Sequence, residues 1–361
     1  MSTRREFLTQ AAVATFMAGA AAAPAEAAET KPVPSGTAAA KPAAMKTYTV
    51  PHTDLVVSRL AYGNAMLGFD RNSPDFIPQT VATMQAAADQ GITLFDTADV
   101  YAHGKSEEAL GQLLKGAPGL RRRLVIQSKC SIVEGGGIDA SSEHITSAVE
   151  GSLKRLGTDH LDILLLHWPD TLVEPQEVAR AFDDLHGAGK VRYFGVSNHT
   201  PYQIELLRNQ VRQPLVINQI QLGLAHWYTQ PGASKGAVTH GGEGVGTLDY
   251  CRVQNIQVQA YSPLRGSNIG NPPNLLNPPA DAPAEVRKAA DALQEVARTH
   301  DTSPAAIMLA WLLHHPAGIV PIIGATKVEH VVDNCAADRV QLSRTEWYSL
   351  LRATAPLEQH T

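Results

Sequence analysis

Short apolar runs alternate with amphipathic segments along most of the chain. The apolar runs, such as Leu161–His167, are aliphatic over most of their length, which is typical of parallel strands buried on both faces. The segments between them, such as Ser142–Leu156, repeat apolar residues at helical spacing. The predicted strands are Leu60–Tyr62, Thr93–Phe95, Leu124–Gln127, Leu161–His167, Arg192–Val196, Val216–Gln219, Val258–Ala260 and Ile319–Pro321. The predicted helices are Gln79–Gln90, Glu107–Lys115, Ser142–Leu156, Pro175–Gly187, Leu248–Gln254 and Pro304–His314.

This order of elements predicts an α/β fold, a (β/α)8 TIM barrel. Eight strands separated by helices over about 270 residues fit a barrel better than an open sheet. An open, doubly wound sheet would require a Gly-x-Gly-x-x-Gly turn after its first strand. No such turn follows Leu60–Tyr62, and Gly135-Gly136-Gly137 has no phosphate-loop pattern. We expect residues 46–58 to form a hairpin that caps the barrel bottom, and residues 343–354 to form an extra C-terminal helix.

Composition narrows the class of protein further. The 361 residues are 44% hydrophobic and 18% charged, which is typical of a globular protein. The net charge of −5 argues against a nucleic-acid partner, which requires a basic patch. The three cysteines have no close spacing, which excludes a disulfide framework and a CxxC zinc site. After residue 30 no uninterrupted apolar run reaches about 18 residues, so we expect no membrane insertion of the mature protein.

The first residues have the pattern of an export signal. Arg4-Arg5-Glu6-Phe7-Leu8 forms a twin-arginine motif, and the apolar stretch Ala11–Ala23 follows it. Ala25-Glu26-Ala27 is a small-x-small cleavage site. We therefore predict a signal peptide over residues 1–27, a disordered linker over 28–45 and one barrel domain over 46–361. The expected location is the periplasm, reached through the twin-arginine export machinery.

Polar residues follow several predicted strands, at the barrel end where catalytic groups gather. Asp96 and Tyr101 follow the second strand, Lys129 the third, and His167 ends the fourth. A buried lysine beside a tyrosine disfavours the neutral phenol, so we expect the pKa of Tyr101 to be lowered. Asp96 can keep Lys129 charged, and His167 can donate a hydrogen bond to a substrate carbonyl or share a proton with Tyr101. Together they form a general acid suited to carbonyl reduction, which also needs a hydride from a cofactor.

These residues lie in motifs that resemble the aldo-keto reductase family, and the resemblance covers about residues 46–354. The segments Asp159-His160-Leu161-Asp162 and Pro321-Ile322-Ile323-Gly324 are similar to those of a bacterial oxidoreductase branch of this family. The motifs are Phe95-Asp96-Thr97-Ala98-Asp99-Val100-Tyr101, Ser128-Lys129, Leu164-Leu165-Leu166-His167-Trp168-Pro169-Asp170, Gly195-Val196-Ser197-Asn198, Asn218-Gln219 and Ala260-Tyr261-Ser262-Pro263-Leu264.

The resemblance implies roles for individual residues. It makes Tyr101 the proton donor, which Lys129 and Asp96 tune, and His167 the residue that orients the carbonyl. It also implies a nicotinamide cofactor whose carboxamide is held by Ser197, Asn198 and Gln219 and whose ring stacks on Tyr261. The pyrophosphate of this cofactor would lie along residues 262–266, and residues 324–334 would cover its adenosine. The full implied set is Asn64, Ser197, Asn198, Gln219, Tyr261, Ser262, Pro263, Leu264, Gly266, Gly324, Lys327, His330 and Asn334.

The adenosine segment departs from the family pattern at one position. His330 stands where family members that prefer NADPH place an arginine for the 2′-phosphate. Lys327 can supply a point charge, and the helix start near Thr326 adds partial positive charge. NADP is the favoured cofactor, and NAD or dual use stays open.

A long polar connection, residues 222–246, follows the sixth strand, and it is read either as an ordered lid or as a mobile insertion. Trp227 and Tyr228 within it, and Trp168, are candidate walls for a substrate.

The resulting prediction is a monomeric NAD(P)H-dependent reductase of a small aldehyde or ketone. Two alternatives stay open: a non-catalytic nucleotide-binding module on the same fold, and a metal-dependent hydrolase. The 14 histidines lack a compact ligand spacing such as His-Glu-x-x-His, so no metal site is predicted.

Overall fold

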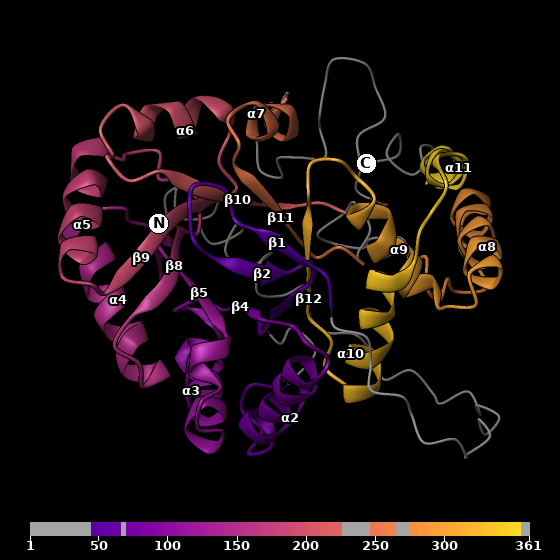
Figure 1. Cartoon of the computed structure of the whole chain (residues 1–361), viewed down its shortest axis with the longest axis horizontal. Helices are drawn as coiled ribbons and strands as arrows, with labels where there is room; N and C mark the ends of the chain where they lie inside the picture. Colours follow the sequence, from indigo (N-terminus) through magenta and orange to yellow (C-terminus); the bar gives the residue numbers. More distant parts are fainter. Residues whose placement is uncertain (1–44, 66–69, 226–245, 265–273, 355–361) are drawn as a thin grey trace, which may run out of the picture.

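The computed structural model describes residues 45–65, 70–225, 246–264 and 274–354. The strands of its central barrel are β3 (Ala61–Gly63), β4 (Leu94–Asp96), β5 (Val125–Cys130), β8 (Leu161–Leu166), β9 (Val191–Ser197), β10 (Leu215–Gln221), β11 (Gln257–Tyr261) and β12 (Val320–Ile323). They pair in parallel and close into a ring in the order β10-β11-β12-β3-β4-β5-β8-β9. Helices surround this ring (Figure 1), so the predicted (β/α)8 TIM barrel is confirmed.

All eight predicted strands are present, with boundaries that shift by a few residues. Strand β5 runs three residues beyond the predicted end, because Lys129 and Cys130 continue the parallel pairing with Leu165 and Leu166 of β8. We call the end where the strands finish the mouth of the barrel and the opposite end its bottom. The extension of β5 places Lys129 within a strand at the mouth.

The helices follow the predicted alternation with two additions, α6 (Pro201–Arg208) and α8 (Ala284–Thr299). The helix start expected near Thr326 is that of α10 (Val328–Cys335). Helix α6 has a signal in the sequence, because Thr200 and Gln203 form a capping box with Pro201 between them. The helices are α2 (Phe76–Asp89), α3 (Lys105–Gly116), α4 (Ser142–Leu156), α5 (Pro175–Gly187), α6 (Pro201–Arg208), α7 (Thr247–Val253), α8 (Ala284–Thr299), α9 (Pro304–Leu313), α10 (Val328–Cys335) and α11 (Arg344–Thr354).

Helix α11 is the expected extra C-terminal helix, and it packs beside α8 (Figure 1). Its Trp347 stacks on Trp311 of α9 with ring centroids 4.4 Å apart. Each indole N–H donates to the other residue's backbone carbonyl, at 3.0 and 2.9 Å. In the part of the chain that the structure describes, every helix is too short or too polar to cross a bilayer.

The predicted hairpin caps the bottom of the barrel. Its strands are β1 (Thr47–Thr49) and β2 (Val56–Ser58), and Val50, Leu55 and Val57 pack on the apolar side chains inside the barrel. A second hairpin, of β6 (Ile132–Val133) and β7 (Gly137–Ile138), contains the glycine triplet.

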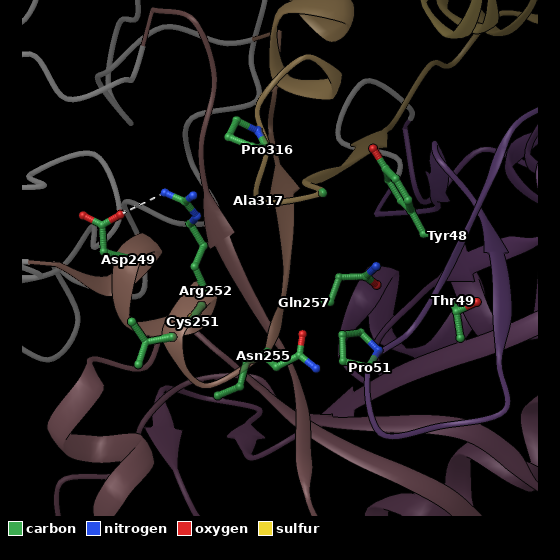
Figure 2. Close-up of a pocket in the computed structure, with 13 residues that line it drawn as sticks. Tyr48, Thr49, Pro51, Asp249, Cys251, Arg252, Asn255, Gln257, Pro316 and Ala317 are labelled. Carbon is green, nitrogen blue, oxygen red and sulfur yellow. Dashed lines mark ion pairs between the residues drawn. The ribbon is translucent and has the colours of Figure 1, made fainter.

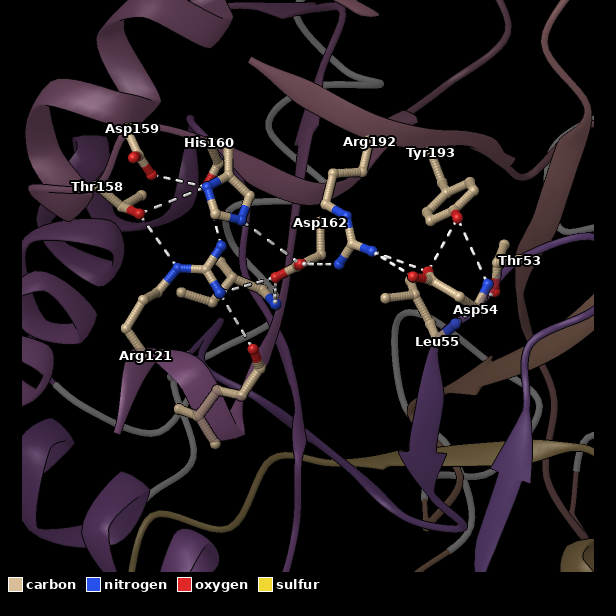
Figure 3. A network of polar contacts seen from close by, with 12 residues as sticks. Thr53, Asp54, Leu55, Arg121, Thr158, Asp159, His160, Asp162, Arg192 and Tyr193 are labelled. Atoms are coloured by element: carbon tan, nitrogen blue, oxygen red, sulfur yellow. Dashed lines mark hydrogen bonds and ion pairs between the residues drawn. The ribbon is translucent and has the colours of Figure 1, made fainter. Parts of the chain in front are cut away.

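Charged side chains fasten the bottom hairpin to the barrel (Figure 3). Arg192 of β9 contacts Asp54 of the hairpin at 2.8 Å and Asp162 of β8 at 3.0 Å. Arg121 contacts the other oxygen of Asp162 at 2.9 Å. The hydroxyl of Tyr193 donates to Asp54 at 2.9 Å. The bottom is therefore closed by apolar packing inside and by an ion-pair network outside.

Candidate active site

The structure brings the four predicted catalytic residues together at the mouth. Lys129 is fully buried, and its ammonium group donates three hydrogen bonds. These reach Asp96 Oδ1 at 2.6 Å, the Thr97 carbonyl at 2.8 Å and Tyr101 Oη at 3.2 Å. An ammonium group has three N–H donors, so all of them are used. Because the Tyr101 oxygen accepts from Lys129, its own hydrogen is left for another acceptor.

Backbone pairing continues beyond the strand ends and fixes this segment. The Thr97 N–H donates to the Gln127 carbonyl at 2.9 Å, and the Asp99 N–H donates to the Lys129 carbonyl at 3.2 Å. After Tyr101 the chain turns sharply, since Ala102 and His103 both have left-handed backbone angles, with φ of 50° and 56°. For residues other than glycine this conformation costs about 1–2 kcal/mol each.

Burial decides the ionisation of the phenol. It raises the pKa of Tyr101 above its ordinary value of 10.0, whereas the charge of Lys129 acts to lower it. The expected net lowering of this pKa is therefore wrong, because removal from water outweighs the ammonium group. Burial also acts to lower the pKa of Lys129, but Asp96 and Tyr101 leave it raised. The result is a protonated phenol beside a charged ammonium group.

His167 lies beside the phenol as a neutral imidazole. Its ring meets the Tyr101 ring edge to face, with centroids 5.5 Å apart. Burial, followed by the charge of Lys129, holds the pKa of His167 well below its ordinary value. Its Nδ1 is buried and has no hydrogen-bond partner among the described residues. A neutral imidazole has one N–H, so this environment favours a proton on Nε2.

The residues predicted for the carboxamide also cluster at the mouth. The Ser197 hydroxyl donates to the Gln219 carbonyl at 2.9 Å, and the Asn198 amide donates to the His167 carbonyl at 3.1 Å. Tyr261 is half-buried, and its hydroxyl donates to Asn198 Oδ1 at 3.0 Å. The Gln219 amide donates to Asp96 Oδ2 at 2.8 Å, which the sequence analysis did not anticipate.

The other predicted cofactor residues have varied surroundings. Ser262, Pro263 and Leu264 continue from β11, and Gly324 follows β12. At α10, Lys327 and His330 are exposed and Asn334 is buried. Asn64 is buried after β3 and donates to the Ser106 carbonyl at 2.8 Å. Trp168 is half-buried after β8. Gly266, Trp227 and Tyr228 lie outside the described residues.

Two buried glutamines at this site were missed by the sequence analysis. Gln127 precedes Lys129 by two residues on β5, and Gln259 precedes Tyr261 by two on β11. Side chains two residues apart on a strand share a face, so strand alternation was the signal that could have found them. Gln127 donates to Asp96 Oδ2 at 2.6 Å and to Gln259 Oε1 at 2.8 Å.

A cavity of about 570 Å³ lies at the other end of the barrel (Figure 2). It is lined by Tyr48 of the bottom hairpin, by Arg252 of α7, by Gln257 at the start of β11, and by Ala317 before β12. Arg252 is paired with Asp249 at 3.5 Å. The cavity is separate from the polar cluster at the mouth. Over the described ranges, no three His, Cys, Asp or Glu side chains converge as metal ligands would.

Sequence comparison places the chain among known oxidoreductases. A profile of the Aldo/keto reductase family matches residues 59–353. The 6-dehydroglucose reductase of Agrobacterium fabrum is 34% identical over 305 residues, which are 82% of this chain and 94% of that protein. The oxidoreductase YdhF of Escherichia coli is 35% identical over 282 residues, which are 76% of this chain and 87% of that protein.

Solved structures show the same likeness. An aldo-keto reductase from Klebsiella pneumoniae in complex with NADPH superposes with a TM-score of 0.64 at 30% identity, over 82% of this chain and 91% of that one. The glycerol dehydrogenase AKR11B4 from Gluconobacter oxydans has a TM-score of 0.70 at 26% identity, over 86% of this chain and 95% of that one.

Proposed function

We infer that this chain, which belongs to the aldo/keto reductase family, is an NAD(P)H-dependent oxidoreductase that reduces an aldehyde or a ketone to an alcohol. One observation carries the chemistry. Lys129 donates to Tyr101 Oη and uses its other two N–H groups on Asp96 and Thr97, which leaves the phenol hydrogen to be donated. A protonated phenol held in this way is a general acid for a carbonyl oxygen.

The residues at the mouth fit a nicotinamide dinucleotide. The Gln219 side chain donates two hydrogen bonds from its Nε2, to Asp96 and Gln259, and its Oε1 is suited to accept from a carboxamide N–H. The half-buried ring of Tyr261 would lie against the nicotinamide, and Lys327 would meet the 2′-phosphate. The bound cofactor supplies the hydride that the protein lacks. We expect a preference for NADPH, supported by the NADPH complex of the Klebsiella protein.

The proposed step moves one hydride and one proton. As the hydride reaches the carbonyl carbon, negative charge develops on the carbonyl oxygen, and Tyr101 protonates that oxygen. The raised pKa of Tyr101 keeps its proton in place before the reaction. Lys129 stabilises the phenolate that forms, and the neutral His167 orients the carbonyl through Nε2–H. Water then returns a proton to Tyr101.

Isotope transfer tests this function directly. The protein is incubated with NADPH that carries deuterium at C4 of the nicotinamide, and with aldehydes that include a 6-aldehydo sugar, as the name of the Agrobacterium relative suggests. We expect one deuterium on the carbinol carbon of the product by mass spectrometry. Tight NADPH binding in calorimetry with no labelled alcohol from any aldehyde would instead favour a non-catalytic nucleotide-binding module.

We also propose export to the periplasm and a monomeric state. The Arg4-Arg5 motif and the apolar segment after it support export, and they lie outside the described residues. Cell fractionation of a bacterial host tests this, with the Arg4→Lys, Arg5→Lys double variant as the control. We expect the unaltered chain in the periplasmic fraction and the variant in the cytoplasm. Sedimentation of the purified protein tests the monomer.

A further inference from the structure

Four buried side chains form a closed ring of hydrogen bonds beneath Lys129. Gln127 Nε2 donates to Asp96 Oδ2 at 2.6 Å and to Gln259 Oε1 at 2.8 Å. Gln219 Nε2 donates to the same two oxygens, at 2.8 and 2.9 Å. A fifth bond runs back from Gln259 Nε2 to Gln127 Oε1 at 3.0 Å. We call Asp96, Gln127, Gln219 and Gln259 the amide ring.

The amide ring spans the inside of the barrel. Asp96 lies on β4 and Gln219 on β10, which are four positions apart in the closed order of eight strands. Gln127 on β5 and Gln259 on β11 are also four positions apart. The ring therefore joins two pairs of opposite walls. All four side chains are at most 4% exposed, so water does not compete for these bonds.

Only one orientation of the amides satisfies every member. Rotating the Gln127 amide would set its oxygen against the Asp96 carboxylate. Rotating the Gln259 amide would set its nitrogen between two N–H donors, from Gln127 and Gln219. Because buried polar groups without partners are costly, the ring holds a single arrangement. In that arrangement Asp96 Oδ2 accepts two amide bonds and Asp96 Oδ1 is directed at Lys129.

We propose that Gln127 and Gln259 are positioning residues for the reduction, because the amide ring fixes the Asp96 carboxylate that holds Lys129 against Tyr101. This inference rests on the proposed function. Gln127 acts on Asp96 directly, and Gln259 acts by aligning the two amides that donate to it. Among the described residues, Gln127 and Gln259 form their side-chain hydrogen bonds with the other members of the amide ring, so both act on Lys129 and Tyr101 through Asp96.

The chain offers a matched control two residues away. Gln257 lies on the same strand and the same face as Gln259, and is 5% exposed, but it lines the cavity at the bottom. Its Oε1 has no hydrogen-bond partner in the described ranges, and it is outside the amide ring. Substituting either glutamine by methionine removes a buried amide from β11, and only the Gln259 change opens the ring.

The experiment compares Gln259→Met, Gln259→Glu and Gln257→Met in the full chain. For Gln259→Met we expect kcat to fall roughly tenfold or more, with the KM for NADPH within about threefold. Without the ring Lys129 moves away from the Tyr101 phenol, which loses the stabilisation of its phenolate form. The apparent pKa above which kcat declines should therefore rise by about half a unit or more. Gln257→Met should keep kcat within about twofold and leave the pH profile unchanged. This should hold even if its urea unfolding midpoint falls as far as that of Gln259→Met.

Gln259→Glu keeps the shape of the side chain and the oxygen that accepts from Gln127 and Gln219. It replaces Gln259→Met in the experiment if that variant does not fold. Gln259→Glu loses the N–H that Gln259 donates to Gln127 Oε1, so kcat should fall in this variant too. A folded Gln259 variant with unchanged kcat and pH profile, or an equal loss in Gln257→Met, would overturn the proposal.

A second readout does not depend on turnover. Alkaline titration of tyrosinate absorbance, taken as the difference from Tyr101→Phe, should show the same upward shift in Gln259→Met and no shift in Gln257→Met. If the shift appears and no aldehyde is reduced, the amide ring stands and the proposed function fails. If aldehydes are reduced and the shift is absent, the proposed function stands and the role of the glutamines fails.

Discussion

The mouth and the bottom of the barrel each contain a carboxylate, a cation and a phenol, in different arrangements. At the mouth, Asp96 holds Lys129, whose ammonium lies 4.8 Å from the centroid of the Tyr101 ring. At the bottom, Asp54 holds Arg192, whose guanidinium lies 5.5 Å from the centroid of the Tyr193 ring. The decisive difference is the phenol hydrogen. Tyr193 donates to Asp54, whereas Tyr101 accepts from Lys129.

This comparison shows that an Asp–cation–Tyr group is not itself a proton donor. A phenol whose hydrogen is bound by a carboxylate serves as a brace, and Tyr193 braces the hairpin. A phenol whose oxygen accepts from a fully buried ammonium keeps its hydrogen for a ligand. Exposure reinforces the difference, since the Arg192 side chain is 36% exposed and that of Lys129 is fully buried.

The largest expected effect comes from removing each phenol oxygen. Tyr101→Phe should lower kcat by about 10³-fold, within the range for loss of a general acid, and leave the melting temperature nearly unchanged. Tyr193→Phe should keep kcat within about twofold. Steady-state reduction of an aldehyde with NADPH measures both. Equal losses in the two variants would mean that the phenols do not differ in role.

Removing the cation should lower the free energy of unfolding more at the mouth than at the bottom. Lys129→Met leaves Asp96 buried without its charged partner, so we expect a loss of about 3–5 kcal/mol in the free energy of unfolding. Arg192→Met should lose about 1 kcal/mol, because its ion pairs are partly exposed. Urea unfolding measures both. The double variant Lys129→Met, Asp96→Asn should regain stability without turnover; failure to regain it would show that the buried charge is not the cause.

The mouth should also respond to acid. Burial lowers the pKa of His199, after β9, to about 4, and His167 is shifted in the same direction. The unfolded chain binds these protons near pH 6.5, so the stability is present above that pH and is lost as the pH falls toward 4. We expect His199 alone to cost about 2 kcal/mol at pH 5 relative to pH 7. Urea unfolding at the two values measures this.

His199→Asn supplies the comparison for the acid response. The Nδ1 of His199 bonds the Ser197 carbonyl at 2.8 Å, and an asparagine amide can replace that donor. The difference in stability between pH 5 and pH 7 should shrink by about 2 kcal/mol in this variant. An unchanged difference would place the acid response in other side chains.

The smallest expected effect concerns the hairpin. Asp54→Asn weakens contacts with Arg192 and Tyr193 while the apolar packing of Val50, Leu55 and Val57 remains. Because the Asp54 side chain is 69% exposed, we expect a loss of about 1 kcal/mol or less, with kcat unchanged. Thermal unfolding measures the first and the aldehyde assay the second. A lower kcat would show that the bottom is coupled to the mouth.

The sequence could predict the strands because hydrophobic runs and parallel pairing agree, as in Leu161–Leu166. It could predict that Asp96, Lys129 and His167 meet, because strand ends converge in a barrel. It could not predict the net direction of the Tyr101 pKa, since burial comes from the packed structure and opposes the lysine.

The glutamines were missed for a different reason. Gln127 and Gln259 lie inside runs that were recognised by their apolar neighbours, and a polar residue there carries no local sign of its partner. Their partners come from strands on the far side of the barrel.

The amide ring has a consequence for when activity appears as the chain refolds. Asp96 and Gln219 are separated by 123 residues, and Gln127 and Gln259 by 132. An intermediate that lacks β10 or β11 cannot contain those contacts, because the amide ring takes Gln219 from β10 and Gln259 from β11. Turnover should therefore not appear during refolding before β10 and β11 have docked onto the earlier strands.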